Sequence, residues 1–119
     1  MKEYHLGEME ARFAGLIWDK EPLSSRSLAE LAQELLNWKR TTTYTVLKRL
    51  CDRGLFQNQN GTVTSLVSRE EFNAHRTEEF IEDAFNGSLP AFLTAFGSRR
   101  KLTDAQIDEL QSIIDGMRG

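Results

Sequence analysis

The sequence predicts a mostly α-helical protein with one small β-hairpin. Three observations favour this fold class: apolar residues recur at helical spacing in several segments, Ser or Thr stands where a helix cap is needed, and one Asn-Gly pair separates two short β-favouring runs. The expected order is three short helices, the hairpin and a helical tail. At 119 residues the chain is long enough to bury a core of its own.

The first two helices are predicted from their apolar faces. Residues 6–18 form the first, with Pro22 just beyond its end; its apolar face comprises Met9, Phe13, Leu16 and Ile17. Ser24 is the expected N-cap of a second helix that runs to about Leu36. Its apolar positions at i, i+3, i+4 and i+7 are Leu28, Leu31, Ala32 and Leu35.

The third helix is expected over Thr41–Arg53. It should end there because the next residue, Gly54, readily adopts the left-handed conformation of a helix stop. A hairpin follows, because residues 55–57 and 62–67 flank Asn60-Gly61, a pair that tolerates positive φ at both positions. The third helix has a predicted core-facing stripe of Val46, Leu47 and Leu50, with Thr43 at its start.

Three further helices are predicted in the tail. Ser68 and Glu71 have the spacing of a capping box, and the helix that they open should run to Phe85 before Asn86-Gly87 ends it. A short helix over 88–96 and a last one, capped by Thr103 and ending near Met117, complete the chain. Helix, helix, turn, helix and hairpin form the winged helix-turn-helix pattern, so we predict a DNA-binding domain over 1–67 and a helical dimerisation domain over 68–119.

The charge of the chain is unevenly distributed. Its net charge is −3, yet residues 1–53 hold nine cations against eight anions, and residues 54–119 hold six against ten. The basic surplus is concentrated around the third helix, where only Asp52 opposes it. The cations are Lys39, Arg40, Lys48, Arg49 and Arg53.

This basic helix predicts DNA binding. A helix that enters the major groove needs slender side chains in its first turns and longer cations where it meets phosphates or guanine edges. Threonines and cations at these positions meet that need, and the helix amino terminus favours phosphate. The candidate DNA-binding residues are Lys39, Arg40, Thr41, Thr42, Tyr44, Thr45, Lys48 and Arg49, with Asn60 at the hairpin tip.

Three alternatives stay open at this point. The cations can form a solvated helix face, and the hairpin tip can be a tight turn without a DNA contact. A winged helix can also be a protein-interaction module without sequence-specific DNA binding, whose basic helix meets an acidic partner. Steep salt dependence and a preference for one palindrome distinguish DNA binding from that module.

Several short stretches occur together in this sequence: Gly7-Glu8-Met9-Glu10, Trp18 and Pro22, "WKRTTTYTVLKRL", "DRGLF", "VTSLVSREEF" and "NGSLPAFLTAF". With these stretches the chain resembles the penicillinase repressor family from about Leu6 to Met117. This resemblance implies a homodimeric repressor that binds an inverted-repeat operator in double-stranded DNA and dimerises through its C-terminal helices.

The resemblance also implies two routes of induction. In one, a membrane-bound sensor metalloprotease triggers cleavage in the dimerisation region; in the other, copper displaces zinc from C-terminal cysteines. This chain has one cysteine, Cys51, which excludes the thiolate switch. Ala95-Phe96 stands where some relatives have Asn-Phe at the cut site.

The tail predicts a dimer by its composition. Three helices in about fifty residues do not easily bury so many apolar side chains alone. Packing of the tail on the first three helices is the alternative. The expected dimerisation residues are Phe72, Phe80, Phe85, Leu89, Phe92, Phe96, Ile107, Leu110 and Ile114.

No residue pattern predicts an enzyme, a metal site or a cofactor. His75 with Glu71 and Glu78 on one helix is a poor metal site, and Cys51 is expected to be a packed side chain. There is no apolar run near the ~20 residues of a membrane span and no signal-peptide pattern, so a cytoplasmic protein without membrane insertion is expected.

Overall fold

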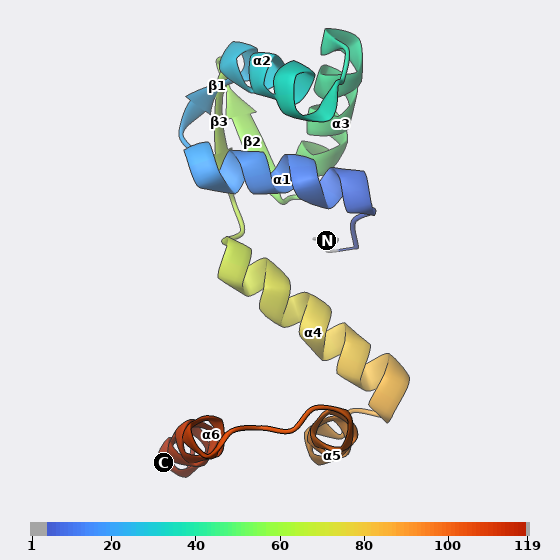
Figure 1. The fold of residues 1–119 in the computed structure, drawn as a ribbon. Coiled ribbons are helices and arrows are strands. Elements are labelled where there is room, and N and C mark those ends of the chain that lie inside the picture. The colour runs from blue at the N-terminus through green and yellow to red at the C-terminus, as the bar shows by residue number, and fades with distance from the viewer. Residues whose placement is uncertain (1–4, 119) are drawn as a thin grey trace. The chain divides into compact units, whose positions relative to one another are not determined.

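The computed structural model describes residues 5–118 and divides the chain into two compact units, Met1–Thr77 and Glu78–Gly119. The predicted fold class is confirmed: six helices accompany a small antiparallel sheet (Figure 1). The division falls inside a helix, ten residues after the predicted domain boundary at Val67/Ser68, which stays a prediction.

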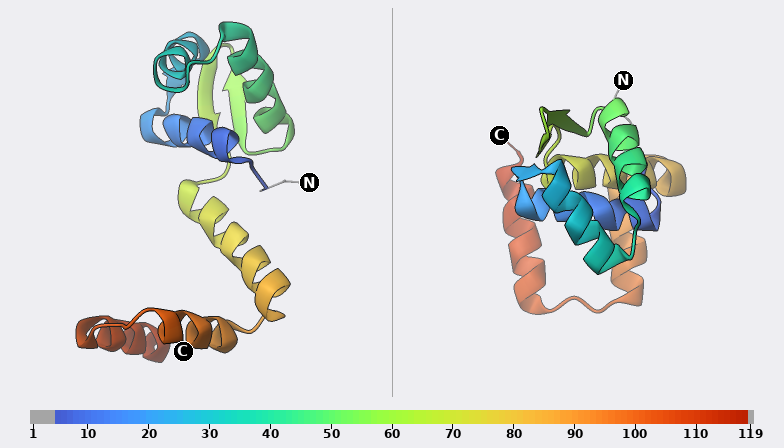
Figure 2. Two further views of the ribbon diagram at one scale, coloured as in Figure 1. Left: turned by 45° about the vertical axis from the view of Figure 1, so that its right-hand side comes forward. Right: turned by 90° about the horizontal axis from the view of Figure 1, so that it is seen from above.

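The N-terminal unit has the predicted order of elements. It contains α1 (Glu8–Lys20), β1 (Leu23–Ser24), α2 (Ser25–Leu36), α3 (Arg40–Asp52), β2 (Phe56–Gln59), β3 (Thr62–Ser65) and the start of α4 (Arg69–Phe85). Helix α1 packs on α2 and β3, while α3 packs on α2 and β2 (Figure 2).

The sheet has one strand more than the sequence predicted. Its order is β1-β3-β2, with both pairs antiparallel, and Leu23 of β1 lies opposite Val63 of β3. No strand was predicted for β1, because two residues are too short to show an alternating pattern. The predicted turn is confirmed, since Asn60 has φ 53° and Gly61 has φ 86°.

Aromatic packing organises the core of this unit. The Trp18 ring lies 5.2 Å from the rings of Phe56 and Phe72, and its indole N–H donates to the Val67 carbonyl at 2.9 Å. Phe13 packs against Trp38 at 5.0 Å. Phe72, expected at the dimer surface, is 2% exposed here and belongs to the core of the N-terminal unit, although it lies on α4.

The buried face of α2 differs from the predicted one at its end. Leu28 and Ala32 are buried as expected, but Leu36 takes the place predicted for Leu35, which is 51% exposed. The turn after α2 begins at once with Asn37 at φ 58°, so Leu36 is the last residue that this helix presents to the core.

Polar caps start four of the helices, and the caps at Ser24, Ser68 and Thr103 were predicted, whereas Ser88 was expected only as the first residue of its helix. The Ser24 hydroxyl accepts from the Ser27 amide, Ser68 from Glu71, Ser88 from Ala91, and Thr103 from Gln106. Each of these bonds satisfies a backbone amide in the first turn of a helix, which has no carbonyl acceptor within the helix itself.

The C-terminal unit comprises the end of α4, α5 (Leu89–Arg99) and α6 (Asp104–Gly116). Edge-to-face contacts link Phe80, Phe85 and Phe92, with ring centroids 5.6–6.3 Å apart. No residue from 78 to 118 is buried in the single chain. The exposed large apolar side chains of this unit are Phe80, Leu89, Leu93, Phe96, Ile107, Ile113, Ile114 and Met117.

Candidate nucleic-acid interface

Helix α3 has one buried and one exposed side, and the predicted core stripe is confirmed. Thr43, Val46, Leu47 and Leu50 are buried. The Thr43 hydroxyl donates to the Lys39 carbonyl at 3.2 Å, so the one polar side chain of this stripe keeps a hydrogen-bond partner. The buried contacts of the helix are therefore all on one face.

The eight candidate residues of this segment all lie outside that core. Each is exposed: Lys39, Arg40, Thr41, Thr42, Tyr44, Thr45, Lys48 and Arg49. The Thr45 hydroxyl donates to the Thr41 carbonyl at 2.9 Å, which leaves its oxygen able to accept. We name this set of exposed residues the α3 outer face.

The cations of the α3 outer face differ in their partners. Lys48 pairs with Asp52 at 3.2 Å, and the two side chains are strongly exposed. Arg49 pairs with Glu10 of α1 at 3.1 Å. Within residues 5–118, Lys39 and Arg40 form no ion pair, so their charges are the least compensated at the start of α3.

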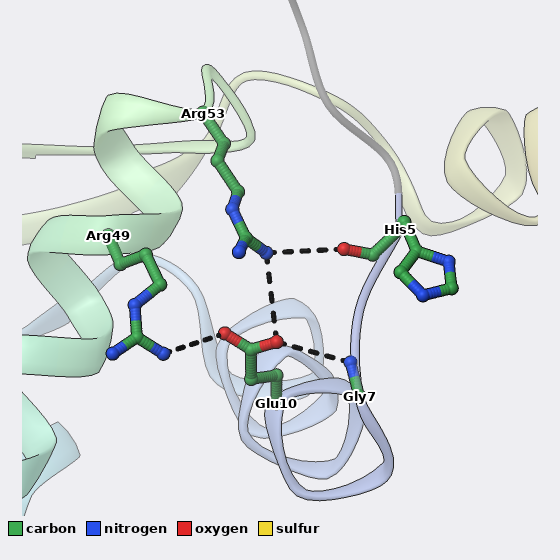
Figure 3. A network of polar contacts seen from close by, with 5 residues as sticks. All are labelled: His5, Gly7, Glu10, Arg49 and Arg53. Carbon is green, nitrogen blue, oxygen red and sulfur yellow. Dashed lines mark hydrogen bonds and ion pairs between the residues drawn. The ribbon is translucent and has the colours of Figure 1, made fainter.

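Glu10 connects α1 with the end of α3 (Figure 3). Its carboxylate contacts Arg49 at 3.1 Å and Arg53 at 3.6 Å, and it accepts from the Gly7 amide at 3.1 Å. Arg53 also donates to the His5 carbonyl at 3.2 Å. Sequence analysis missed this cluster, because 39 residues separate Glu10 from Arg49 and no local pattern relates them.

The polar contacts of Glu10 favour its charged form. The hydrogen bond from the Gly7 amide and the interactions with Arg49 and Arg53 lower the pKa of Glu10, against a smaller opposing effect of burial. The carboxylate is therefore ionised at neutral pH, and the cluster holds one negative and two positive charges.

The hairpin tip carries the remaining candidate. Asn60 is exposed at the turn between β2 and β3. The Gly61 carbonyl accepts from the Ser25 amide at 2.7 Å, which ties the turn to the start of α2. A hollow of about 320 Å³ lies between α3 and β2, lined by Tyr44, Leu47, Lys48, Cys51 and Asn58.

Cys51 and His75, the two residues considered for thiol chemistry and for metal binding, are half-buried. Burial, and to a smaller extent the neighbouring Asp52, raises the pKa of the Cys51 thiol, so it is protonated at neutral pH. His75 lies on α4 in the N-terminal unit. Across residues 5–118, no three His, Cys, Asp or Glu side chains converge as a metal site would need.

Most of the predicted dimerisation residues lie in the C-terminal unit. Phe80, Leu89, Phe96, Ile107 and Ile114 are exposed, whereas Phe85, Phe92 and Leu110 are half-buried. Leu110 lines a hollow of about 280 Å³ beside α6, with Leu102, Gln106, Glu109 and Ile113. No helix in the described part of the chain is long and apolar enough to span a bilayer.

The three helices, the closing hairpin and a polar helix face define a winged helix-turn-helix protein. Comparison with known proteins gives the family. The family described as "Penicillinase repressor" matches residues 6–116, and the chain belongs to it. The chain is thus a transcriptional repressor by family.

A curated relative covers nearly the whole chain. The methicillin resistance regulatory protein MecI of Staphylococcus aureus (strain Mu50) is 24% identical over 118 residues, which are 96% of each chain. That protein is named as a regulator, in agreement with the family.

Proposed function

We propose that this protein is a homodimeric repressor that binds an inverted-repeat operator in double-stranded DNA and places α3 in the major groove. The observation that carries the proposal is the sidedness of α3: its apolar stripe is buried, while its threonines and cations are exposed. A recognition helix needs this arrangement, because one face must be packed against its own domain while the other contacts bases and phosphates.

The chemistry of the α3 outer face supports distinct roles along the helix. Lys39 and Arg40, at the amino end, carry uncompensated charge where the helix dipole also attracts phosphate. Thr41, Thr42 and Thr45 present methyl groups and hydroxyls, which contact thymine methyls and base edges. Asn60 at the hairpin tip is uncharged, so its contribution to the wing is by amide hydrogen bonds.

The C-terminal unit supports the homodimer. Its apolar side chains form no buried core in one chain, so a second copy would remove them from water. Obligate dimer interfaces resemble a core divided between two chains. Two-fold symmetry then matches an inverted repeat, whose half-sites lie one DNA turn or a multiple of it apart.

Induction by proteolysis is the candidate route that the family resemblance implies, with a membrane-bound sensor metalloprotease as the partner and the cytoplasm as the place of action. Ala95 and Phe96 lie within α5, where the backbone is helical. Because proteases cleave extended backbone, this segment must unwind before a cut there.

Selection from a pool of random duplexes tests the proposed function. Dimeric protein should enrich a palindromic site, and its affinity should fall steeply as salt rises. Recovery of no preferred sequence, or binding that is insensitive to salt, would contradict it.

Arg49→Ala tests whether the exposed side of α3 is the side that contacts DNA. We expect the variant to lose about 1–3 kcal/mol of binding free energy for the selected duplex while it stays folded, because Arg49 lies on the exposed side of the helix. Arg26→Ala is the matched control, since Arg26 is an exposed arginine of α2 that is also ion-paired, with Glu30. Equal affinity of the two variants in a binding titration would count against this placement of the helix.

A further inference from the structure

The Glu10 cluster gives Arg49 an environment that the other cations of the α3 outer face lack. The Glu10 side chain is 19% exposed, while that of Arg49 is 50% exposed. One end of the ion pair is thus fixed inside the unit, and the other reaches the surface that we propose for DNA.

The carboxylate is held from three directions. The Gly7 amide, Arg53 and Arg49 contact it, and all three belong to the N-terminal unit (Figure 3). Because Glu10 is fixed in this way, it fixes the guanidinium of Arg49 in turn. Among the described contacts, Arg49 uses only its Nη1 atom for Glu10. A guanidinium has five N–H donors, so others remain for a DNA acceptor.

We propose that Glu10 is a specificity-determining residue that positions Arg49 and offsets part of its charge toward DNA of random sequence. The inference rests on the proposed function. Binding to random DNA depends mainly on cations that replace the counterions of phosphates. A guanidinium that is already paired contributes little to this attraction, whereas a fixed one can still donate to an acceptor placed correctly in the operator.

Glu10→Gln is the direct test. Glutamine has nearly the same shape and can still accept from the Gly7 amide, but it does not neutralise Arg49. The probes are the duplex that wild-type protein selects from a random pool and a duplex of equal length without that site. We expect the affinity for the second duplex to rise about three- to tenfold near 0.1 M salt, with a salt slope steeper by about one. The ratio of the two affinities should fall.

Glu8→Gln is the matched control for this change. Glu8 lies two residues away in the same turn of α1, is exposed, and forms no hydrogen bond or ion pair with another described side chain. It loses the same charge near the same place. If Glu8→Gln shifts both affinities as much as Glu10→Gln does, the inference is wrong and only overall charge matters.

A double variant assigns the effect to Arg49. In the Arg49→Gln background, Glu10→Gln should raise the affinity for the duplex without the site much less, because Arg49 is gone and the other cation that Glu10 contacts, Arg53, is only 23% exposed. An unchanged increase would overturn the inference while leaving the proposed function intact. Failure of wild-type protein to select any duplex would instead overturn the proposed function, and the inference with it.

If Glu10→Gln does not fold, two substitutions in α3, Arg49→Gln and Arg40→Gln, test the inference instead. Arg49→Gln should weaken binding to the duplex without the site less than Arg40→Gln does, because Glu10 already offsets part of the charge of Arg49 and Arg40 has no such partner within the described chain. The opposite order would contradict the inference. Thermal unfolding of each variant establishes that the folded protein is being compared.

Discussion

At the scale of single residues, Glu10 contributes to how the N-terminal unit responds to acid. The Gly7 amide and two arginines lower its pKa from the ordinary value near 4.5. A carboxyl whose pKa is lower in the folded than in the unfolded state stabilises the fold above its unfolded pKa. This stabilisation is lost as the pH falls through the folded pKa.

Glu10→Gln should therefore change the pH dependence of stability. Wild-type protein should exceed the variant in free energy of unfolding at neutral pH, and the difference should shrink as the pH falls below about 4.5. Chemical denaturation at a series of pH values measures it. A difference that stays constant down to pH 2 would show that the ionisation of Glu10 does not contribute.

Phe72 shows that neighbouring phenylalanines of one helix have different roles. It is fully packed against Trp18, whereas Phe80 of the same helix is exposed in the single chain. We expect Phe72→Ala to lower the free energy of unfolding of the N-terminal unit by about 3–5 kcal/mol, because it leaves a cavity in the core.

Tryptophan fluorescence during denaturation reports this loss, since Trp18 lies beside the substituted ring. Leu35→Ala is the control, because Leu35 is an exposed apolar residue of α2 and should cost about 0.5 kcal/mol or less. A loss for Phe72→Ala as small as that of the control would mean that the ring is not part of the core.

At the scale of elements, the hairpin depends on the backbone of its turn. Gly61 has φ 86°, a conformation that costs an L-residue about 1–2 kcal/mol, although the space beside it is open as far as the Ser25 hydroxyl at 4.0 Å. We expect Gly61→Ala to destabilise the N-terminal unit by that amount in thermal unfolding. Gly61→Asn should cost less, because asparagine tolerates positive φ; equal losses would point to crowding instead.

Local signals explain why the elements could be predicted. Ser24, Ser68, Ser88 and Thr103 each stand at a helix start, and each makes the capping bond that such residues favour. These features depend on residues within four positions of one another. The stripe of α3 was predictable for the same reason, because helical periodicity alone decides which side is apolar.

What could not be predicted depends on residues far apart in the chain. Strand β1 exists because β3 lies beside it, and the Glu10 cluster exists because Glu10 of α1 lies within ion-pair distance of Arg49 and Arg53. Phe72 and Phe80 are alike in sequence context, and only tertiary packing separates the buried ring from the exposed one. The candidate DNA-binding residues were predicted as a set, but the partner of Arg49 was not.

At the scale of the whole molecule, the exposed apolar surface of the C-terminal unit carries the proposed dimer. Leu110→Asp should disrupt it, because the substitution places a charge among Leu102 and Ile113. Sedimentation should then show a monomer, and the affinity for a palindromic duplex should fall about 10²- to 10⁴-fold as avidity is lost. Trp18 fluorescence should stay that of the folded N-terminal unit.

Gln111→Glu is the control for this substitution. It adds the same charge at the next position of α6, on an exposed polar side chain that bonds to Asp115. A monomeric wild-type protein, or equal dissociation by both variants, would contradict the proposed interface.

The bond between the Ser25 amide and the Gly61 carbonyl has a kinetic consequence. With the pairing of Ser24 and Thr62, it joins the hairpin turn to the start of α2, so neither can open alone. The Ser25 and Thr62 amides should therefore exchange with deuterium as one cooperative unit. Movement of the β2–β3 hairpin away from α2 therefore requires that the hydrogen bond at the first turn of that helix breaks.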